Sequence, residues 1–233
     1  MPVIVFDLDD TLYDEMSFVR SGFLAVAAFL EEQKGIPSRQ CFAEMLEWLE
    51  REGRGQVFDA VLRKHKCFSR RLARRCVTVY RTHRPDIKLL PDAERALEMI
   101  GGVYPLYIVT DGNKLVQWNK LKALGLIDHP HIRRCFVTRR FGIRNEKPSP
   151  YCFGLICRAE RVEPCDVVYV GDNPNKDFVG IKPLGYRTVR IRRGAWAGLR
   201  KPAEYEAEYE IDALTELVDL LRQIYGQKPG RSL

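Results

Sequence analysis

The sequence has no uninterrupted apolar segment long enough to cross a membrane. About 18 consecutive apolar residues are needed to span a bilayer, and no window of this chain reaches that length. Met1 leads directly into an apolar stretch, without the basic and apolar regions of a secretory signal. We therefore expect no membrane partner and a cytoplasmic location.

Cysteine is present, but not in the pattern of a disulfide framework or a structural metal site. The seven cysteines are an odd number and include no C-x-x-C pair. The chain is also too long to depend on cross-links for folding. We therefore expect reduced thiols. Internal repeats and low-complexity segments are absent as well, which excludes solenoids and disordered linkers.

Size and charge are those of a globular protein with a basic surface. The chain has 233 residues, of which 45% are hydrophobic, and a net charge of +7. The densest basic run, residues 63–76, carries apolar residues at helical spacing between its cations, which favours a helix with one solvated basic face. We expect no nucleic-acid partner, and we favour a monomer over a dimer because no long apolar stripe is left unassigned.

Short apolar runs separated by helical segments predict a doubly wound, Rossmann-like α/β fold with a parallel sheet. Such runs are nearly continuous in apolar residues, as expected for strands covered on both faces. Helical spacing predicts core helices over 93–100 and 214–224, and residues 194–210 have the composition of a loop. We expect residues 226–233 to be a frayed tail. The expected strands are 3–8, 104–109, 132–137, 167–170 and 187–191.

Residues 15–84 contain helical patterns and no convincing strand. This segment is too long for an ordinary connection between a strand and a helix. We therefore expect an all-helical cap subdomain over 15–84, inserted into a core domain formed by 1–14 and 85–233. Ser38 and Ser69 are the expected N-caps of two of its helices.

Polar clusters stand where the expected strands give way to loops. They read "DLDDT" from Asp7, "VTDGN" around Thr110, "NEKPSP" around Lys147 and "GDNPNKD" around Asp172. Ligands of open α/β sheets bind at the carboxyl ends of the strands, so these clusters can converge on one crevice. Asp7 and Asp9 are two residues apart, and strand periodicity would point both carboxylates to the same side.

These residue types suit the transfer of a phosphoryl group. Asp7 and Asp172 offer the hard oxygen ligands that Mg²⁺ prefers, and Asp7 is a potential nucleophile. Lys147 and Mg²⁺ would offset the repulsion between a carboxylate and a phosphate, while Thr110 and the turn amides after it could hold phosphate oxygens. Asp9 could protonate the leaving alcohol and later activate water.

The four clusters together resemble the motifs of the haloacid dehalogenase-like hydrolase superfamily, and the helical insertion is similar to the C1-type cap of that family. The resemblance implies that Asp7 is the nucleophile and that Asp9 is the general acid/base, with a backbone carbonyl that also binds metal. The implied catalytic set is Asp7, Asp9, Thr110 and Lys147, and the metal set is Asp7, Asp9 and Asp172. The candidate phosphate contacts are Leu8, Thr110, Asp111 and Lys147, and the candidate supporting residues are Thr11, Asn113, Asn173 and Asp177.

Within that superfamily we favour a Mg²⁺-dependent phosphomonoester hydrolase acting on a small phosphorylated substrate. A chain that keeps both Asp9 and Asp172 has the acid and the metal ligand that breaking a P–O bond requires. The expected substrates are sugar phosphates or nucleoside monophosphates. A phosphomutase, a haloacid dehalogenase and a non-catalytic protein that binds RNA or an acidic partner through its basic cap remain alternatives.

The cap is expected to act as a lid that excludes water and selects the substrate. Arg54 lies in a glycine-flanked loop and is the first candidate for contact with the substrate, followed by Arg20 and Arg139.

Overall fold

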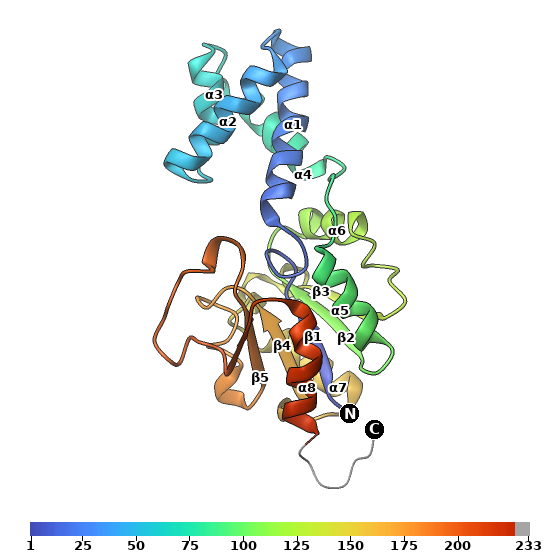
Figure 1. Cartoon of the computed structure of the whole chain (residues 1–233). Helices are drawn as coiled ribbons and strands as arrows, with labels where there is room; N and C mark the ends of the chain where they lie inside the picture. The colour runs from blue at the N-terminus through green and yellow to red at the C-terminus, as the bar shows by residue number, and fades with distance from the viewer. Residues whose placement is uncertain (227–233) are drawn as a thin grey trace. The chain divides into compact units, whose positions relative to one another are not determined.

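A computed structural model describes residues 1–226, so that all of the expected frayed tail at 226–233 except Gly226 lies outside the described residues. Six strands form one sheet in which every pair is parallel, in the order β3-β2-β1-β4-β5-β6. The doubly wound α/β class is thereby confirmed (Figure 1). The strands are β1 (Val3–Phe6), β2 (Leu106–Thr110), β3 (Ile132–Val137), β4 (Val167–Gly171), β5 (Arg187–Ile191) and β6 (Tyr209–Ile211).

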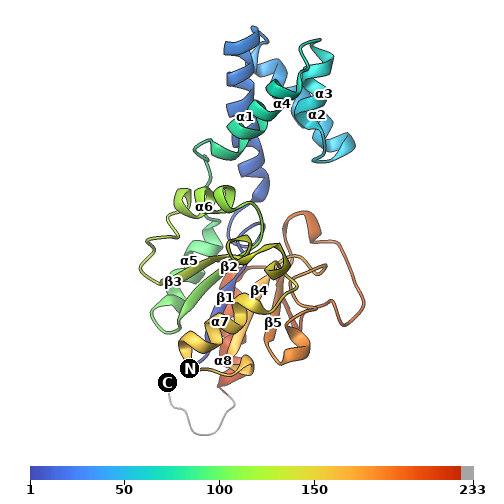
Figure 2. The same cartoon turned by 180° about the vertical axis from the view of Figure 1, so that it is seen from behind.

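Helices cover both faces of the sheet, which is why the central strands are apolar at every position. On one face Val5, Val109 and Tyr169 pack in a core cluster with Phe153 and Ile156 of α7 (Tyr151–Glu160). The alternate residues of the same strands point to the opposite face, on the side of α5 (Pro91–Gly101) and α8 (Leu217–Tyr225). Figures 1 and 2 show α5 and α8 in front of the sheet in one view and α7 in front in the reverse view.

The sixth strand corrects the expectation that residues 194–210 form a loop. β6 has only three residues and pairs with β5 through Val189 and Tyr209, Arg190 and Glu210, and Ile191 and Ile211. A short, charged edge strand has no apolar run to indicate it, and charge is how edge strands avoid pairing with other molecules. Backbone pairing with β5 holds β6 in place, and Glu208, just before β6, forms an ion pair with Arg187 of β5 at 3.5 Å.

The chain divides into two compact units, one formed by residues 1–15 with the chain from Lys88 onward, and the other by Met16–Ile87. The second unit is helical and has its own core, in which Phe23, Val26, Met45, Leu62 and Cys76 are buried. Its helices are α1 (Glu15–Lys34), α2 (Ser38–Glu52), α3 (Val57–Lys64) and α4 (Arg70–Thr82).

Two local expectations about the helical unit need correction. Ser38 is the first residue of α2 rather than its N-cap, and its backbone N–H donates to Glu31 at 3.2 Å. The basic run at 63–76 is not one helix, because α3 ends at Lys64 and α4 begins at Arg70. Ser69 does cap α4, accepting from the N–H of Leu72 at 3.2 Å.

Nothing in the described part of the chain is suited to spanning a bilayer, since no helix there is both long and apolar enough. All seven cysteines are free thiols, as expected.

Candidate active site

A buried lysine occupies the centre of the site at the carboxyl end of the sheet. Lys147 Nζ lies 2.9 Å from Asp7 Oδ1 and 2.8 Å from Asp177 Oδ1, and it donates to the hydroxyl of Tyr169 at 2.7 Å. Asp7 directly follows β1, and its N–H donates to the carbonyl of Val170 in β4 at 2.8 Å. Burial alone would lower the pKa of Lys147, but Asp177 and Asp7 outweigh it and raise that pKa well above its usual value. Lys147 is therefore a fixed cation against the Asp7 carboxylate.

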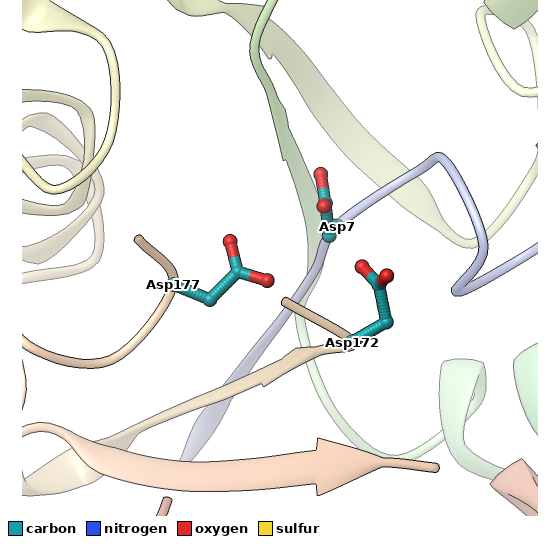
Figure 3. Close-up of side chains that lie close together, drawn as sticks. All are labelled: Asp7, Asp172 and Asp177. Atoms are coloured by element: carbon teal, nitrogen blue, oxygen red, sulfur yellow. The ribbon is translucent and has the colours of Figure 1, made fainter. Parts of the chain in front are cut away.

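Three buried carboxylates gather at this point. Ligand oxygens of Asp7, Asp172 and Asp177 all lie within 4.8 Å of one another. Figure 3 shows these side chains coming from the end of β1, the end of β4 and the loop after β4. One lysine cannot neutralise three carboxylates, and hard oxygen donors in such a cluster suit Mg²⁺. The donor set therefore fits this cation, with Asp177 as a further candidate ligand beside Asp7 and Asp172.

The pKa values of Asp7 and Asp172 also show that the cluster has more negative than positive charge. Burial, followed by repulsion from Asp177 and Asp7, raises the pKa of Asp172 to about 9. Burial also raises the pKa of Asp7 to about 6, against the opposing attraction of Lys147. Without a metal ion, Asp172 therefore retains its proton at neutral pH, while Asp7 is largely ionised. A divalent cation would take the place of that proton.

Two glycines allow the backbone to approach closely around these carboxylates. A Cβ on Gly171 would lie 2.6 Å from Asp177 Oδ2, and a Cβ on Gly180 would lie 1.7 Å from the carbonyl oxygen of Pro148. Because Pro148 follows Lys147, the contact at Gly180 packs the segment after β4 directly against the loop that carries the lysine. A larger residue at Gly171 would displace the Asp177 carboxylate, and one at Gly180 would displace the backbone of Pro148, which follows Lys147.

Thr110 is the last residue of β2 and is fully buried, and the turn that follows it begins with Asp111. The Thr110 hydroxyl accepts from Gln117 Nε2 at 2.6 Å. Asp111 accepts from the Thr138 hydroxyl at 2.7 Å and from the Lys147 N–H at 3.1 Å. The Asp111 side chain thus organises the loops, which leaves its backbone amide as the candidate phosphate contact.

The candidate supporting residues lie in the turns around the carboxylates. Asn113 caps α6 (Lys114–Ala123) by accepting from the N–H groups of Leu115 and Val116. The Asn173 N–H donates to Asp177 Oδ2 at 2.8 Å. The Leu8 carbonyl accepts from the N–H of Thr11 at 3.3 Å, whereas the buried Thr11 hydroxyl has no hydrogen-bond partner among the described residues.

Asp7 and Asp9 have different hydrogen-bonding partners, although the charge of Asp9 contributes to the raised pKa of Asp7. β1 ends at Phe6, so the alternation of a strand does not extend through both aspartates. Asp9 Oδ1 accepts from Lys120 Nζ at 2.6 Å, and Asp9 Oδ2 accepts from Gln117 Nε2 at 2.8 Å. Burial would raise the pKa of Asp9, but Lys120 and the hydrogen bonds hold it below its usual value. The two carboxylates therefore contact different cations.

The three candidate specificity arginines belong to different units. Arg20 and Arg54 are exposed residues of the helical unit, on α1 and in the segment between α2 and α3. Arg139 belongs to the sheet unit, where its Nε donates to Glu146 at 2.7 Å. Their contact with substrate remains a prediction.

Sequence reasoning missed several residues that touch the predicted ones. Gln117 and Lys120 belong to α6, the helix that begins shortly after Thr110. Tyr169 lies inside an apolar strand, where it has the pattern of a core residue. Lys176, whose Nζ lies 3.1 Å from Asp111 Oδ2, directly precedes Asp177. Helical spacing would have placed Gln117 and Lys120 on one face of α6, but nothing in the sequence shows which face meets Asp9.

Fold and site together define a class of protein. A doubly wound parallel sheet carries, at the carboxyl ends of β1 and β4, a potential nucleophile, a cation-binding group of carboxylates and a buried lysine. This combination of groups is suited to a hydrolase.

Comparison with known proteins identifies the family. Residues 1–185 match the family model for haloacid dehalogenase-like hydrolases, and the chain belongs to that family. It is 29% identical over 230 residues to a glyceraldehyde 3-phosphate phosphatase of Methanopyrus kandleri, an alignment that covers 95% of this chain and 97% of the relative. An N-acylneuraminate-9-phosphatase of Homo sapiens is 25% identical, with 95% and 94% covered.

The chain is also similar to solved structures. The crystal structure of a HAD phosphatase from Thermococcus onnurineus has a TM-score of 0.60 and 28% identity, with 95% of this chain and 98% of that chain covered. Within its family the chain is a phosphatase, as the sequence predicted.

Proposed function

We propose that this phosphatase hydrolyses monoesters of small phosphorylated metabolites in two steps through an aspartyl-phosphate on Asp7, with Mg²⁺ as cofactor. The observation that carries this proposal is the position of Lys147 Nζ, 2.9 Å from Asp7 Oδ1, beside carboxylates that can hold a cation. A carboxylate that attacks a phosphate meets strong repulsion, and a fixed ammonium group reduces it.

In the first step an Asp7 carboxylate oxygen forms a bond to phosphorus, and the ester P–O bond breaks. The leaving alkoxide takes a proton from Asp9, which is ionised in the ligand-free protein and must therefore bind that proton when the ester binds. In the second step water, deprotonated by Asp9, attacks the same phosphorus, which releases inorganic phosphate and restores the Asp7 carboxylate. Lys147 and the Thr110 hydroxyl would bind the phosphate oxygens.

The Mg²⁺ site would be formed by carboxylate oxygens of Asp7 and Asp172, by the backbone carbonyl of Asp9 and, on the geometry described above, by Asp177. When bound, Mg²⁺ supplies positive charge to the phosphate oxygens. The raised pKa of Asp172, about 9, supports this assignment, because a cation is what a cluster so rich in negative charge lacks.

The last part of the proposal concerns the helical unit and the three arginines. A lid carrying Arg20 and Arg54 would select the substrate, with Arg139 contributing from the sheet unit once its ion pair with Glu146 opens. Because the relatives named above act on glyceraldehyde 3-phosphate or on an acylneuraminate 9-phosphate, three-carbon and sugar phosphates are the first substrates to test.

A panel of phosphomonoesters that includes glyceraldehyde 3-phosphate, sugar phosphates and nucleoside monophosphates tests the proposal. We expect turnover that requires Mg²⁺, is lost in Asp7→Asn and persists in Asp128→Asn, a matched change at an exposed aspartate of the same unit. Acid quenching of wild type with ³²P-labelled substrate should trap a phosphorylated protein. Turnover in Asp7→Asn at the wild-type rate would refute the role of Asp7.

A further inference from the structure

The Asp9 carboxylate is held by three side chains that no motif of the sequence analysis included. Lys120 Nζ and the Tyr13 hydroxyl both donate to Oδ1, and Gln117 Nε2 donates to Oδ2 at 2.8 Å. Lys120 is 3% exposed and Gln117 is 2% exposed, so neither is a surface residue that meets Asp9 by chance. Buried polar groups are costly unless they are paired, and here each is paired with the same carboxylate.

Gln117 also joins Asp9 to the phosphate side of the site. Its Nε2 lies 2.6 Å from the Thr110 hydroxyl as well as 2.8 Å from Asp9 Oδ2. One amide group therefore fixes the distance between the candidate acid/base and the candidate phosphate contact. Gln117 and Lys120 are three residues apart on α6, so both point from the same face of one rigid element.

This arrangement separates the charges of the site into two groups. Lys147 contacts Asp7 and Asp177, whereas Lys120 contacts Asp9 and lies 3.9 Å from Glu15. A lysine that served only to neutralise the acidic cluster would contact Asp7, Asp172 or Asp177. Lys120 instead restrains the one aspartate whose proposed work is done at the leaving group.

From these contacts we infer that Gln117 and Lys120 are positioning residues, which hold the Asp9 carboxylate beside Thr110 so that it faces the leaving-group oxygen. The inference rests on the proposed function, in which Asp9 transfers the proton. A positioning role differs from that of a purely structural ion pair in one measurable respect. Loss of the positioning residues should affect esters that need a proton on the leaving group more than esters that do not.

Two synthetic substrates distinguish these cases. Phenyl phosphate has a poor leaving group that benefits from protonation, whereas 2,4-dinitrophenolate leaves without a proton. Acid–base catalysis contributes about 10²–10⁴-fold, and a displaced acid should lose a large part of it. In Gln117→Leu and Lys120→Met we expect kcat/KM for phenyl phosphate to fall at least about tenfold more than kcat/KM for 2,4-dinitrophenyl phosphate. This ratio reports the transfer of the phosphoryl group to Asp7, whereas the second step uses Asp9 in the same way for both esters.

The controls separate positioning from folding. Lys122→Met removes an exposed lysine of the same helix and should leave both rates at wild-type values. Lys120→Arg keeps a cationic donor and should restore part of the lost selectivity. If Lys120→Met fails to fold, Gln117→Leu still tests the inference, because it is close to isosteric and leaves no cation buried without its partner.

The possible outcomes distinguish failure of the positioning role from failure of the proposed function. An equal loss of kcat/KM on both substrates would overturn the positioning role while the proposed function stands. Failure of wild type to hydrolyse these esters and every monoester of the panel above, or full activity of Asp7→Asn on both esters, would overturn the proposed function and the positioning role together.

Discussion

The stability of the metal-free protein should fall as the pH rises from 6 to 8, because of Asp172. Its pKa is raised to about 9 in the folded protein, from 3.8 in the unfolded chain. Between these values the folded state holds a proton that the unfolded state has lost, so each pH unit removes about 1.4 kcal/mol of unfolding free energy. The stabilisation is complete below the unfolded pKa and is lost as the pH rises toward the folded one.

Over two pH units the expected loss is about 3 kcal/mol, and for a chain of this size it corresponds to a fall in Tm of roughly 6–12 °C. Asp7, with a pKa of about 6, adds little in this window because it is already largely ionised above pH 6. The assay is thermal unfolding in EDTA at pH 6, 7 and 8. Wild type is compared with Asp172→Asn, which cannot ionise at this position and should lack this part of the pH dependence.

Mg²⁺ should act in the opposite direction. It competes with the proton of Asp172, so the increase in Tm that it causes in wild type should be larger at pH 8 than at pH 6. Parallel pH profiles for wild type and Asp172→Asn in EDTA would refute the reasoning, since they would mean that Asp172 does not retain a proton in the folded protein.

Other predictions concern single contacts. Lys147→Met should abolish turnover and lower the metal-free unfolding free energy by about 3–5 kcal/mol in urea titrations, because buried Asp7 and Asp177 lose their cation; retention of wild-type stability would contradict this. Arg190→Leu should lower the unfolding free energy by a similar ~3–5 kcal/mol and speed proteolysis within residues 194–206. The reason is that this buried arginine donates hydrogen bonds to Glu206 and to the carbonyls of Trp196 and Leu199. An unchanged cleavage rate would show that the loop is held in another way. Gly180→Ala should lower kcat by displacing Pro148 and with it Lys147, and a crystal structure with an unmoved Lys147 would exclude that cause.

Much of the architecture could be read from hydrophobic periodicity. The strands at 132–137 and 187–191 were predicted with their observed bounds, and the helical segment after β1 follows from its lack of strands. β6 escaped detection because its three residues are stabilised by backbone pairing with β5, with an ion pair of the preceding Glu208 beside it, rather than by an apolar run. Ser38 failed as a cap because a capping residue is defined by local backbone geometry, which residue type only favours.

The sequence by itself determined which groups would meet at the carboxyl edge of the sheet. Asp7 and Asp172 follow apolar strands directly, Thr110 ends one, and Lys147 lies in the connection after β3, and the carboxyl ends of parallel strands lie at one edge. Only the tertiary structure decided how the charges are shared, with Lys147 between Asp7 and Asp177, and Lys120 on Asp9. The physical reason is that periodicity fixes the direction of a side chain along its own strand or helix, whereas an ion pair depends on distances between elements that are far apart in the chain.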